Sequence, residues 1–399
     1  MTQQAAVGGR LKLFRLARAM TLDELASATG GLVTKQAISK YERGSMLPSP
    51  RVLGALARAL GVRASELLAA PQVTVEVLGF RKLSRLAKKE QNRVRGVVSR
   101  MLEHRVRLQQ ASGQADGREC EIPVSAYRAS SLQGCEAIAG ALRDSWSLGA
   151  GPISCVTDVL EEHHIHVLEM DTERALDGVA AVARDDSGAI RAAAVVSRRG
   201  LPGDRQRLSL AHELGHLVMQ ESPDVDGEKA AFRFGAAFLA PEELVRRDVG
   251  ATRRKVSLGE LILLKSRYGM SIQSLVYRLR DLGIISEGGA TALWKQINAR
   301  GWKQEEPNPL DPERPQWARR AALRAIAEGS LTVDEAEIMI GVLPDTAHSP
   351  ETNERRDLMK RPPSERIRRL QSDALRASED YVEDREWATL LGGDLLPDE

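Results

Sequence analysis

The sequence predicts a mainly α-helical protein with one small β-sheet, that is, an α+β fold. Apolar residues recur at helical spacing through most of the 399 residues. Strand signals are short, and the clearest is a hairpin at 178–196 that turns at Asp-Asp-Ser-Gly, residues 185–188. Because a chain of this length exceeds one ordinary hydrophobic core, we expect several domains.

Composition and targeting signals favour a cytoplasmic protein. Hydrophobic residues make up 42% of the chain and charged residues 28%, which is typical of soluble globular proteins. No apolar run approaches the roughly 20 residues of a membrane helix, and residues 1–9 lack the apolar centre of a secretion signal. Because no such run is present, we expect no membrane partner. The cysteines, at 120, 135 and 155, are odd in number and widely spaced, so we expect reduced thiols.

Changes in pattern divide the chain into four segments. We expect a domain of five short helices at 8–70, a basic helical connector at 71–118, an α+β domain at 119–307 and a helical C-terminal segment of unknown role at 308–399. Residues 73–80 alternate like a strand. Residues 81–107 carry ten Lys or Arg against two Glu. This bias fits either contacts with nucleic acid or a solvated helix face.

The strongest functional signal is the sequence His212-Glu213-Leu214-Gly215-His216, within a helical pattern at 205–219. Histidines four residues apart project from one face of a helix, so both imidazoles can bind one metal ion. Glu213 lies beside the first histidine, where its carboxylate can act as a general base on water and later protonate a leaving amine. The pattern predicts a catalytic site with one Zn²⁺ per chain.

A catalytic zinc ion also needs a third protein ligand and an open position. Glu228 is our candidate because it begins a second helical pattern at 228–238, and the intervening loop contains Pro and Gly that can reverse the chain. Small residues in this second helix would let it pack closely on the first. Three other acidic residues compete for the role: Glu221, Asp224 and Asp226.

Two stretches around these residues carry a family resemblance. They are Arg205-Gln-Arg-Leu-Ser-Leu-Ala-His-Glu-Leu-Gly-His-Leu-Val-Met219 and Glu228-x-x-Ala231-x-x-Phe234-x-x-x-Phe238-Leu-Ala-Pro241. Together they resemble the ImmA/IrrE family of metallo-endopeptidases, over about residues 137–307. The resemblance implies a zincin-like domain, zinc bound by His212, His216 and Glu228, and Glu213 as the general base. It also implies a protein substrate, often a helix-turn-helix repressor that is cut once.

The N-terminal helices carry a second resemblance. Thr21-Leu-Asp-Glu-Leu-Ala26 contains a capping box, and Thr34-Lys-Gln-Ala-Ile-Ser-Lys-Tyr-Glu-Arg-Gly44 follows it after Gly30-Gly31. These stretches are similar to the Cro/C1-type (XRE) helix-turn-helix. The resemblance implies that one helix faces the major groove of double-stranded DNA with five residues, Thr34, Lys35, Gln36, Ser39 and Lys40. A five-helix protein-interaction module is the alternative.

Together these features favour a DNA-binding regulatory zinc metallo-endopeptidase that hydrolyses a peptide bond in a protein, either a repressor or the product of a neighbouring gene. The alternative is a repressor or antitoxin of a toxin–antitoxin pair, in which the zinc domain senses a signal or binds a partner without turnover. A second copy of the chain is a further candidate partner. We expect residues 189–196 to form an edge strand that pairs with substrate, and consider Tyr268 and Arg278 as oxyanion donors.

Overall fold

The computed structural model describes residues 2–78, 86–113, 122–172 and 176–341. Cys120 and the predicted C-terminal segment beyond 341 lie outside the described residues. Within the described part, Cys135 and Cys155 are free. Burial raises the pKa of Cys135 to about 11 and that of Cys155 to about 12, so both thiols are protonated at neutral pH. Among the described residues, no helix combines the length and apolar character needed to cross a membrane.

Five helices form the N-terminal part of the structure: α1 (Gln3–Ala17), α2 (Leu22–Ala28), α3 (Lys35–Glu42), α4 (Pro50–Leu60) and α5 (Ala64–Leu68). The predicted capping box is present, because the side chain of Thr21 accepts from the Glu24 amide and Glu24 accepts from the Thr21 amide. Helix α1 begins earlier than the sequence predicts. Thr2 caps it, and Val7 is 2% exposed, so its first turns belong to the apolar core.

A four-stranded sheet lies at the centre of the structure, in the order β1-β4-β5-β3. Its strands are β1 (Thr74–Val77), β3 (Ile165–Met170), β4 (Gly178–Arg184) and β5 (Ile190–Arg198). Strands β4 and β5 form the predicted antiparallel hairpin, β3 pairs parallel to β5, and β1 pairs antiparallel to β4. The prediction that residues 189–196 form an edge strand is wrong. Strand β5 has β4 on one side and β3 on the other, so both of its edges are used.

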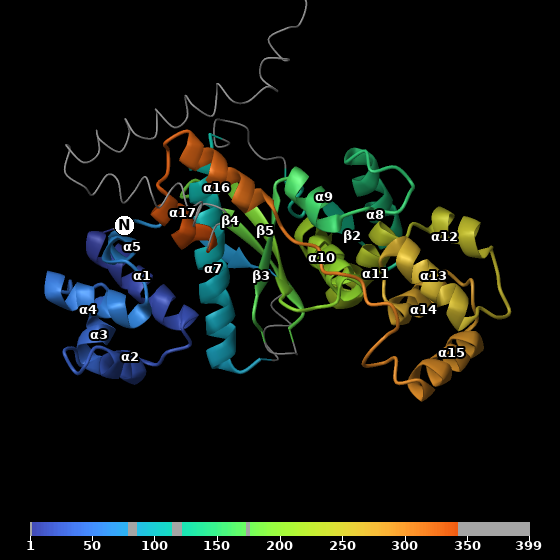
Figure 1. The fold of residues 1–399 in the computed structure, drawn as a ribbon, viewed down its shortest axis with the longest axis horizontal. Helices are drawn as coiled ribbons and strands as arrows, with labels where there is room; N and C mark the ends of the chain where they lie inside the picture. Colours follow the sequence, from blue (N-terminus) through green and yellow to red (C-terminus); the bar gives the residue numbers. More distant parts are fainter. Residues whose placement is uncertain (1, 79–85, 114–121, 173–175, 342–399) are drawn as a thin grey trace, which may run out of the picture. The chain divides into compact units, whose positions relative to one another are not determined.

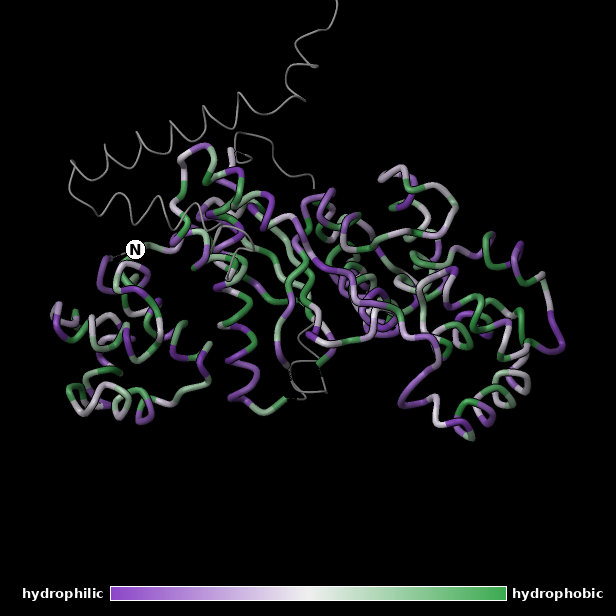
Figure 2. The backbone as a smooth tube through the Cα atoms, in the orientation of Figure 1, coloured by the Kyte–Doolittle hydropathy of each residue, from purple (hydrophilic) through white to green (hydrophobic). Residues whose placement is uncertain are grey.

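One helix covers each face of this sheet (Figure 1). Helix α10 (Gly203–Val218) packs on the face that presents Val182 and Val195, and α7 (Lys88–Ala111) packs on the face that presents Ala181 and Val196. Figure 2 shows the strands of this sheet as mostly hydrophobic segments. Because both faces are covered over β4 and β5, these two strands are mostly apolar and buried, whereas the edge strand β1 alternates.

Residues 71–118 do not serve only as a connector between domains. The described part of this segment contributes β1 to the sheet and α7 to one of its faces. Val94, Val98 and Leu102 are fully buried against the sheet. The basic residues of α7 therefore belong to one side of a core helix. The apolar residues at helical spacing in this segment, among them Val94, Val98 and Leu102, form the buried stripe of the helix.

The remaining elements complete the described structure. They are β2 (Tyr127–Ala129), α8 (Gly134–Ser145), α9 (Val156–Glu162), β6 (Met219–Glu221), α11 (Gly227–Leu239), α12 (Glu242–Val249), α13 (Leu258–Tyr268), α14 (Ile272–Asp281), α15 (Glu287–Ala299), α16 (Trp317–Ala327) and α17 (Val333–Ile340). Among them α8 and α11 pack together beside α10, and α16 and α17 contact α7. Strands β2 and β6 pair in parallel as a separate two-stranded sheet, which the sequence did not predict. Their three-residue length is too short for a period-2 pattern to be visible.

Two glutamates in the stretch between α15 and α16 anchor the first turns of α10. The Glu313 carboxylate accepts from the amides of Val156 and Thr157 at the start of α9 and pairs with Arg207 of α10 at 2.6 Å. The Glu306 carboxylate accepts from the amides at the start of α14 and pairs with Lys265, which also pairs with Asp204 of α10. These buried, charge-assisted contacts fix where α10 begins.

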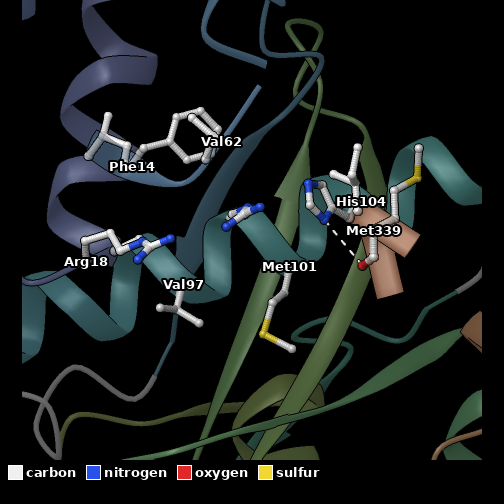
Figure 3. Close-up of a pocket in the computed structure, with 11 residues that line it drawn as sticks. Phe14, Arg18, Val62, Val97, Met101, His104 and Met339 are labelled. Carbon is white, nitrogen blue, oxygen red and sulfur yellow. Dashed lines mark hydrogen bonds between the residues drawn. The ribbon is translucent and has the colours of Figure 1, made fainter. Parts of the chain in front are cut away.

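The N-terminal helices pack against α7 through α1. A Cβ atom at Gly96 of α7 would lie 2.7 Å from the backbone nitrogen of Ala17, so only glycine allows the two helices to approach this closely. Arg10 forms a buried ion pair with Glu103 of α7. A cavity of about 250 Å³ lies beside this contact, and Figure 3 shows His104 of α7 bonded there to the carbonyl of Met339 in α17.

Two buried histidines predict that the fold loses stability in mild acid. Burial, and next the charge of Arg100, lowers the pKa of His104 to about 3, and burial holds the pKa of His166 well below its usual value. Both pKa values are near 6.5 in an unfolded chain. The unfolded state therefore binds more protons between pH 6.5 and about 3. Stability is complete above pH 6.5 and falls below it by about 1.4 kcal/mol per pH unit for each histidine.

Urea unfolding at pH 7 and pH 5 measures this loss. We expect the double variant His104→Gln/His166→Gln to show a clearly smaller drop in unfolding free energy between the two pH values than the unmodified chain. An equal drop in both proteins would contradict the assignment of the acid sensitivity to these side chains.

Candidate metal centre

Helix α10 places two histidines side by side. The Nε2 atoms of His212 and His216 are 3.1 Å apart, and the side chains are 1% and 8% exposed. The four-residue spacing on a continuous helix produces this arrangement, as the sequence predicts. Gly215 lies between them, where a Cβ atom would approach Phe234 of α11 to 3.0 Å. The glycine thus allows the neighbouring helix to pack against α10.

Helix α11 brings a carboxylate to the two imidazoles. Asp226 caps this helix by accepting from the amides of Glu228 and Lys229, which sets Glu228 in the first turn. Gly235 allows α11 to pack closely on α10, because a Cβ atom at this position would lie 3.0 Å from the backbone nitrogen of His212. The Glu228 oxygens lie 3.6 Å from Nε2 of His212 and 3.5 Å from Nε2 of His216.

The three side chains fit a divalent metal ion of the zinc class. One ligand atom from each of His212, His216 and Glu228 lies within 4.8 Å of the others. Ligands at zinc distances of about 2.0–2.1 Å in a tetrahedron are roughly 3.3–3.4 Å apart. The two Nε2 atoms are 3.1 Å apart, and each has a different oxygen of Glu228 at 3.5 or 3.6 Å, so the three side chains are close enough to share one ion. Two nitrogens and one oxygen are donors that zinc accepts readily.

Glu221 holds the other side of His216. Its Oε1 lies 3.7 Å from Nδ1 of that ring, whereas Nε2 faces Glu228. Burial by itself lowers the pKa of His216, but the carboxylates of Glu221 and Glu228 raise it to about 9. Two of the residues that compete to be the third ligand have other contacts. Glu221 faces Nδ1 of His216, as carboxylates behind metal-binding histidines do, and Asp226 caps helix α11. Neither belongs to the three-residue cluster.

Glu213 lies beside the cluster and is buried. Its Oε1 is 4.0 Å from Nε2 of His212, and the side chain is 1% exposed. Strand β4 passes directly over it at Gly178, where a Cβ atom would meet Cγ of Glu213 at 2.9 Å and the carbonyl oxygen of Val196 at 2.8 Å. Gly178 is a site residue that the motifs did not indicate. The only signal was a glycine within a strand pattern, which often marks a close approach.

A cavity of about 420 Å³ opens next to the cluster. Its lining includes His216 and Glu228, the loop after α10, Ser125, and Leu78 at the end of β1. On the other side of the cluster, the ring of Phe232 lies 4.2 Å from the ring of His212 and is 52% exposed. The candidate metal ligands therefore border a surface that has both polar and apolar walls.

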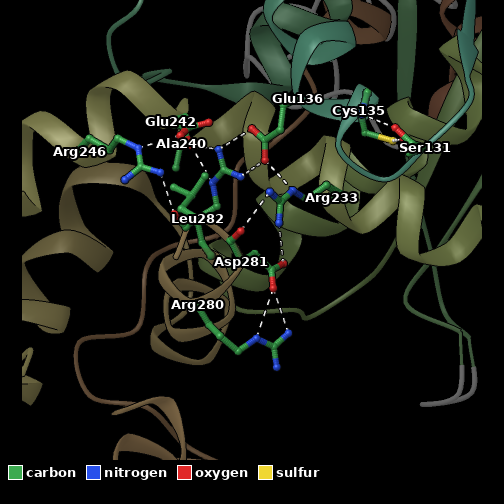
Figure 4. Close-up of polar contacts among 12 residues, drawn as sticks. Ser131, Cys135, Glu136, Arg233, Ala240, Glu242, Arg246, Arg280, Asp281 and Leu282 are labelled. Atoms are coloured by element: carbon green, nitrogen blue, oxygen red, sulfur yellow. Dashed lines mark hydrogen bonds and ion pairs between the residues drawn. The ribbon is translucent and has the colours of Figure 1, made fainter. Parts of the chain in front are cut away.

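The two residues considered as oxyanion donors, Tyr268 and Arg278, are engaged in other contacts. Arg278 is 1% exposed and binds the carbonyl of Ala240 and the carboxylate of Glu136. Figure 4 shows Glu136 also paired with Arg233, which in turn pairs with Asp281. This network joins α8, α11 and α14. The Tyr268 hydroxyl donates to Asp248 at 2.6 Å, and burial, together with this hydrogen bond, raises the pKa of the phenol.

Helix α3 presents most of the predicted DNA-binding residues to solvent. Lys35, Gln36 and Lys40 are exposed, Ser39 is half-buried, and Thr34 caps the helix by accepting from the Ala37 amide. Ile38, which is fully buried, fixes the helix to the core. Lys35 pairs with Asp23 of α2 at 2.6 Å, an exposed contact that competes weakly with a phosphate.

Comparison with known families agrees with both parts of this description. Residues 11–67 match the helix-turn-helix family model. Residues 160–280 match the model of the IrrE N-terminal-like domain, a peptidase family. The chain combines a helix-turn-helix domain with an IrrE N-terminal-like domain. No curated protein matches the chain. The architecture predicted from the two resemblances is thereby confirmed.

The IrrE N-terminal-like match contains His212, Glu213, His216 and Glu228, and also β3, β4, β5 and α10. It begins after β1 and α7 and ends before Glu306 and Glu313. The strand at one edge of the sheet, the helix on one face and the two anchoring glutamates are therefore contributed by parts of this chain outside the matched range.

Proposed function

We propose that the chain is a DNA-binding regulatory zinc metallo-endopeptidase that hydrolyses a peptide bond in a protein substrate. The observation that carries the proposal is the buried Glu213 carboxylate, which lies 4.0 Å from Nε2 of His212. That histidine belongs to the cluster in which one ligand atom each of His212, His216 and Glu228 lies within 4.8 Å of the others. A purely structural metal site would have four protein ligands and no use for a further carboxylate beside it. Three ligands and an adjacent base are the arrangement of a hydrolytic site.

Each residue of the site has a separate role in the proposed hydrolysis. His212, His216 and Glu228 hold the zinc ion, and Glu221 keeps the ring of His216 in place. A bound zinc ion supplies Lewis acidity, which acidifies water and polarises a carbonyl group. Glu213 takes a proton from the attacking water and delivers it to the nitrogen of the leaving amine. Gly178 leaves room for this side chain, because a Cβ atom there would lie 2.9 Å from Cγ of Glu213.

Cleavage by the purified chain tests the proposal. Fluorescein-labelled casein serves as an unstructured probe, and each protein encoded beside the gene is tested as a folded substrate. We expect cleavage that stops with a chelator and returns with added zinc, and a single cut in one neighbouring-gene product, located by mass spectrometry. A repressor is the substrate class that fits a peptidase joined to a helix-turn-helix domain.

The second candidate is a repressor or antitoxin whose zinc domain binds a partner without turnover, and the helix-turn-helix domain favours it. In that case the chain would bind zinc and a neighbouring-gene product, and no cut would appear in any protein tested. Such a result would overturn the enzymatic proposal.

The proposed DNA contacts predict a dependence on salt. Lys40 is exposed on α3, and its removal is expected to weaken binding to a fragment of the chain's own promoter about equally for all sequences. The slope of log affinity against log salt should fall by about one unit. Arg58→Ala is the matched control, because it removes one exposed charge from α4 instead. Equal slopes for Lys40→Ala and Arg58→Ala, measured by fluorescence anisotropy, would exclude Lys40 from the interface.

A further inference from the structure

Strand β1 occupies the edge of the sheet that lies closest to the candidate metal centre. It pairs antiparallel with β4, from Thr74 opposite Arg184 to Val77 opposite Ala181. The pairing continues one residue further, since the Leu78 amide donates to the carbonyl of Ala180 at 2.8 Å. Strand β4 is also the strand that touches Glu213, through Gly178. The ladder between β1 and β4 therefore runs towards the general base.

The end of β1 reaches the cavity beside the metal ligands. Leu78 packs on the same side of the sheet as Ala180 and Val182, which is the side covered by α10. It lines the 420 Å³ cavity together with His216 and Glu228. The side chains of Val75 and Val77 lie on the opposite side, against α7. A segment of the chain itself thus extends along β4 and ends beside the candidate metal centre.

An extended peptide binds a sheet most readily by adding a strand to a free edge. The edge of β4 is the one next to Glu213, and β1 already uses its hydrogen-bonding groups from Ala180 to Arg184. We propose that β1 is an internal competitor, which holds the substrate-binding edge until a protein substrate displaces it. This inference rests on the proposed function, because it names the event that must precede cleavage at the same site.

Strand β1 is shorter and less buried than the other three strands of its sheet. It has four residues, of which Thr74 and Glu76 are exposed and Val75 and Val77 only half-buried. Strands β3, β4 and β5 are almost entirely buried. Only residues 69–73 separate β1 from α5, the last helix of the helix-turn-helix domain. A change in that domain can therefore act on β1 through a very short link.

A reversible crosslink tests whether β1 must leave. Val77 and Ala181 are direct partners across the ladder, and side chains of such partners are close enough for a disulfide when both are cysteine. In Val77→Cys/Ala181→Cys we expect oxidation to lower the rate of labelled-casein cleavage by about tenfold or more, and reduction to restore it. Val77→Cys alone is the control and should not respond. An oxidised double variant as active as the reduced one would overturn the proposal.

The opposite change should activate the enzyme. Leu78→Pro removes the amide that bonds to Ala180, so it weakens the ladder at the end nearest the site. We expect about tenfold faster casein cleavage, because a site open in only a minor population becomes open in most molecules. Gln72→Pro is the matched control, since Gln72 precedes the paired residues. If Leu78→Pro fails to fold, the crosslink decides the question.

Hydrogen exchange separates this proposal from the proposed function. In the Glu213→Gln variant with zinc and excess labelled casein, the Leu78 amide should exchange faster than without casein, because bound substrate displaces β1. Unchanged or slower exchange would refute displacement even if cleavage occurs. If exchange is faster in the Glu213→Gln variant but the unmodified chain cleaves no substrate, the displacement of β1 would be supported and the proposed peptidase activity would be rejected.

Discussion

Replacing Glu213 by glutamine is expected to lower the rate of cleavage by about 10²–10⁴-fold while zinc remains bound. Glutamine keeps the size of the side chain, so the contact with Gly178 survives and the two histidines stay in place. It cannot take a proton from water at neutral pH. The loss should therefore appear in kcat, with little change in KM, because Glu213 acts on the reacting water rather than on substrate binding.

Glu221→Gln is the control for this experiment. It also replaces a carboxylate beside one of the two histidines, but a half-buried one that faces Nδ1 of His216, on the side of the ring away from Glu228. We expect a much smaller effect on the rate, of the size typical of an outer-sphere change, about 10–100-fold at most. Similar losses in the two variants would show that Glu213 contributes only to the electrostatic environment and is not the base.

Replacing His212 by alanine is expected to abolish zinc binding, and with it both activity and the stabilisation that zinc provides. The unmodified chain should contain about one zinc per molecule, and zinc should raise its Tm, since a ligand that binds only the folded state stabilises it. Removing His212 leaves two ligand atoms of the three that converge, too few for a stable site. Metal analysis and thermal unfolding with and without zinc measure both effects.

The identity of the third ligand can be tested in the same way. Glu228→Gln should also lose zinc, whereas Asp226→Asn should keep it, because Asp226 accepts from backbone amides at the start of α11 instead of facing the cluster. Full zinc content in Glu228→Gln would mean that another carboxylate completes the site, and Glu221 would then be the first alternative.

Sequence reasoning succeeded where the relevant geometry is local. The positions of His212 and His216 follow from the helical repeat, and the return of Glu228 follows from a short loop between two helices that pack through small residues. The hairpin of β4 and β5 could likewise be predicted from its turn. In each case the residues that meet are near in sequence, so pattern and spacing carry most of the information.

Pairing between distant segments could not be predicted. Strand β5 was expected at an edge, but β3 joins it from outside the hairpin, and no local pattern encodes that partner. Strand β1 pairs with a strand more than a hundred residues away. The burial of Arg278 against Glu136 and Ala240 could not be seen in the sequence, because it depends on how α8, α11 and α14 assemble. Tertiary contacts of this kind override local composition.

The contribution of β1 to the sheet has a consequence for how such chains can change during evolution. A recombination that exchanged the helix-turn-helix domain at the start of the IrrE N-terminal-like match, residue 160, would also replace β1 and α7, and so strip one edge and one face from the sheet. A junction before Val73 would leave both in place. We infer that helix-turn-helix domains can be exchanged on this IrrE N-terminal-like domain without loss of sheet structure only when the junction lies between α5 and β1.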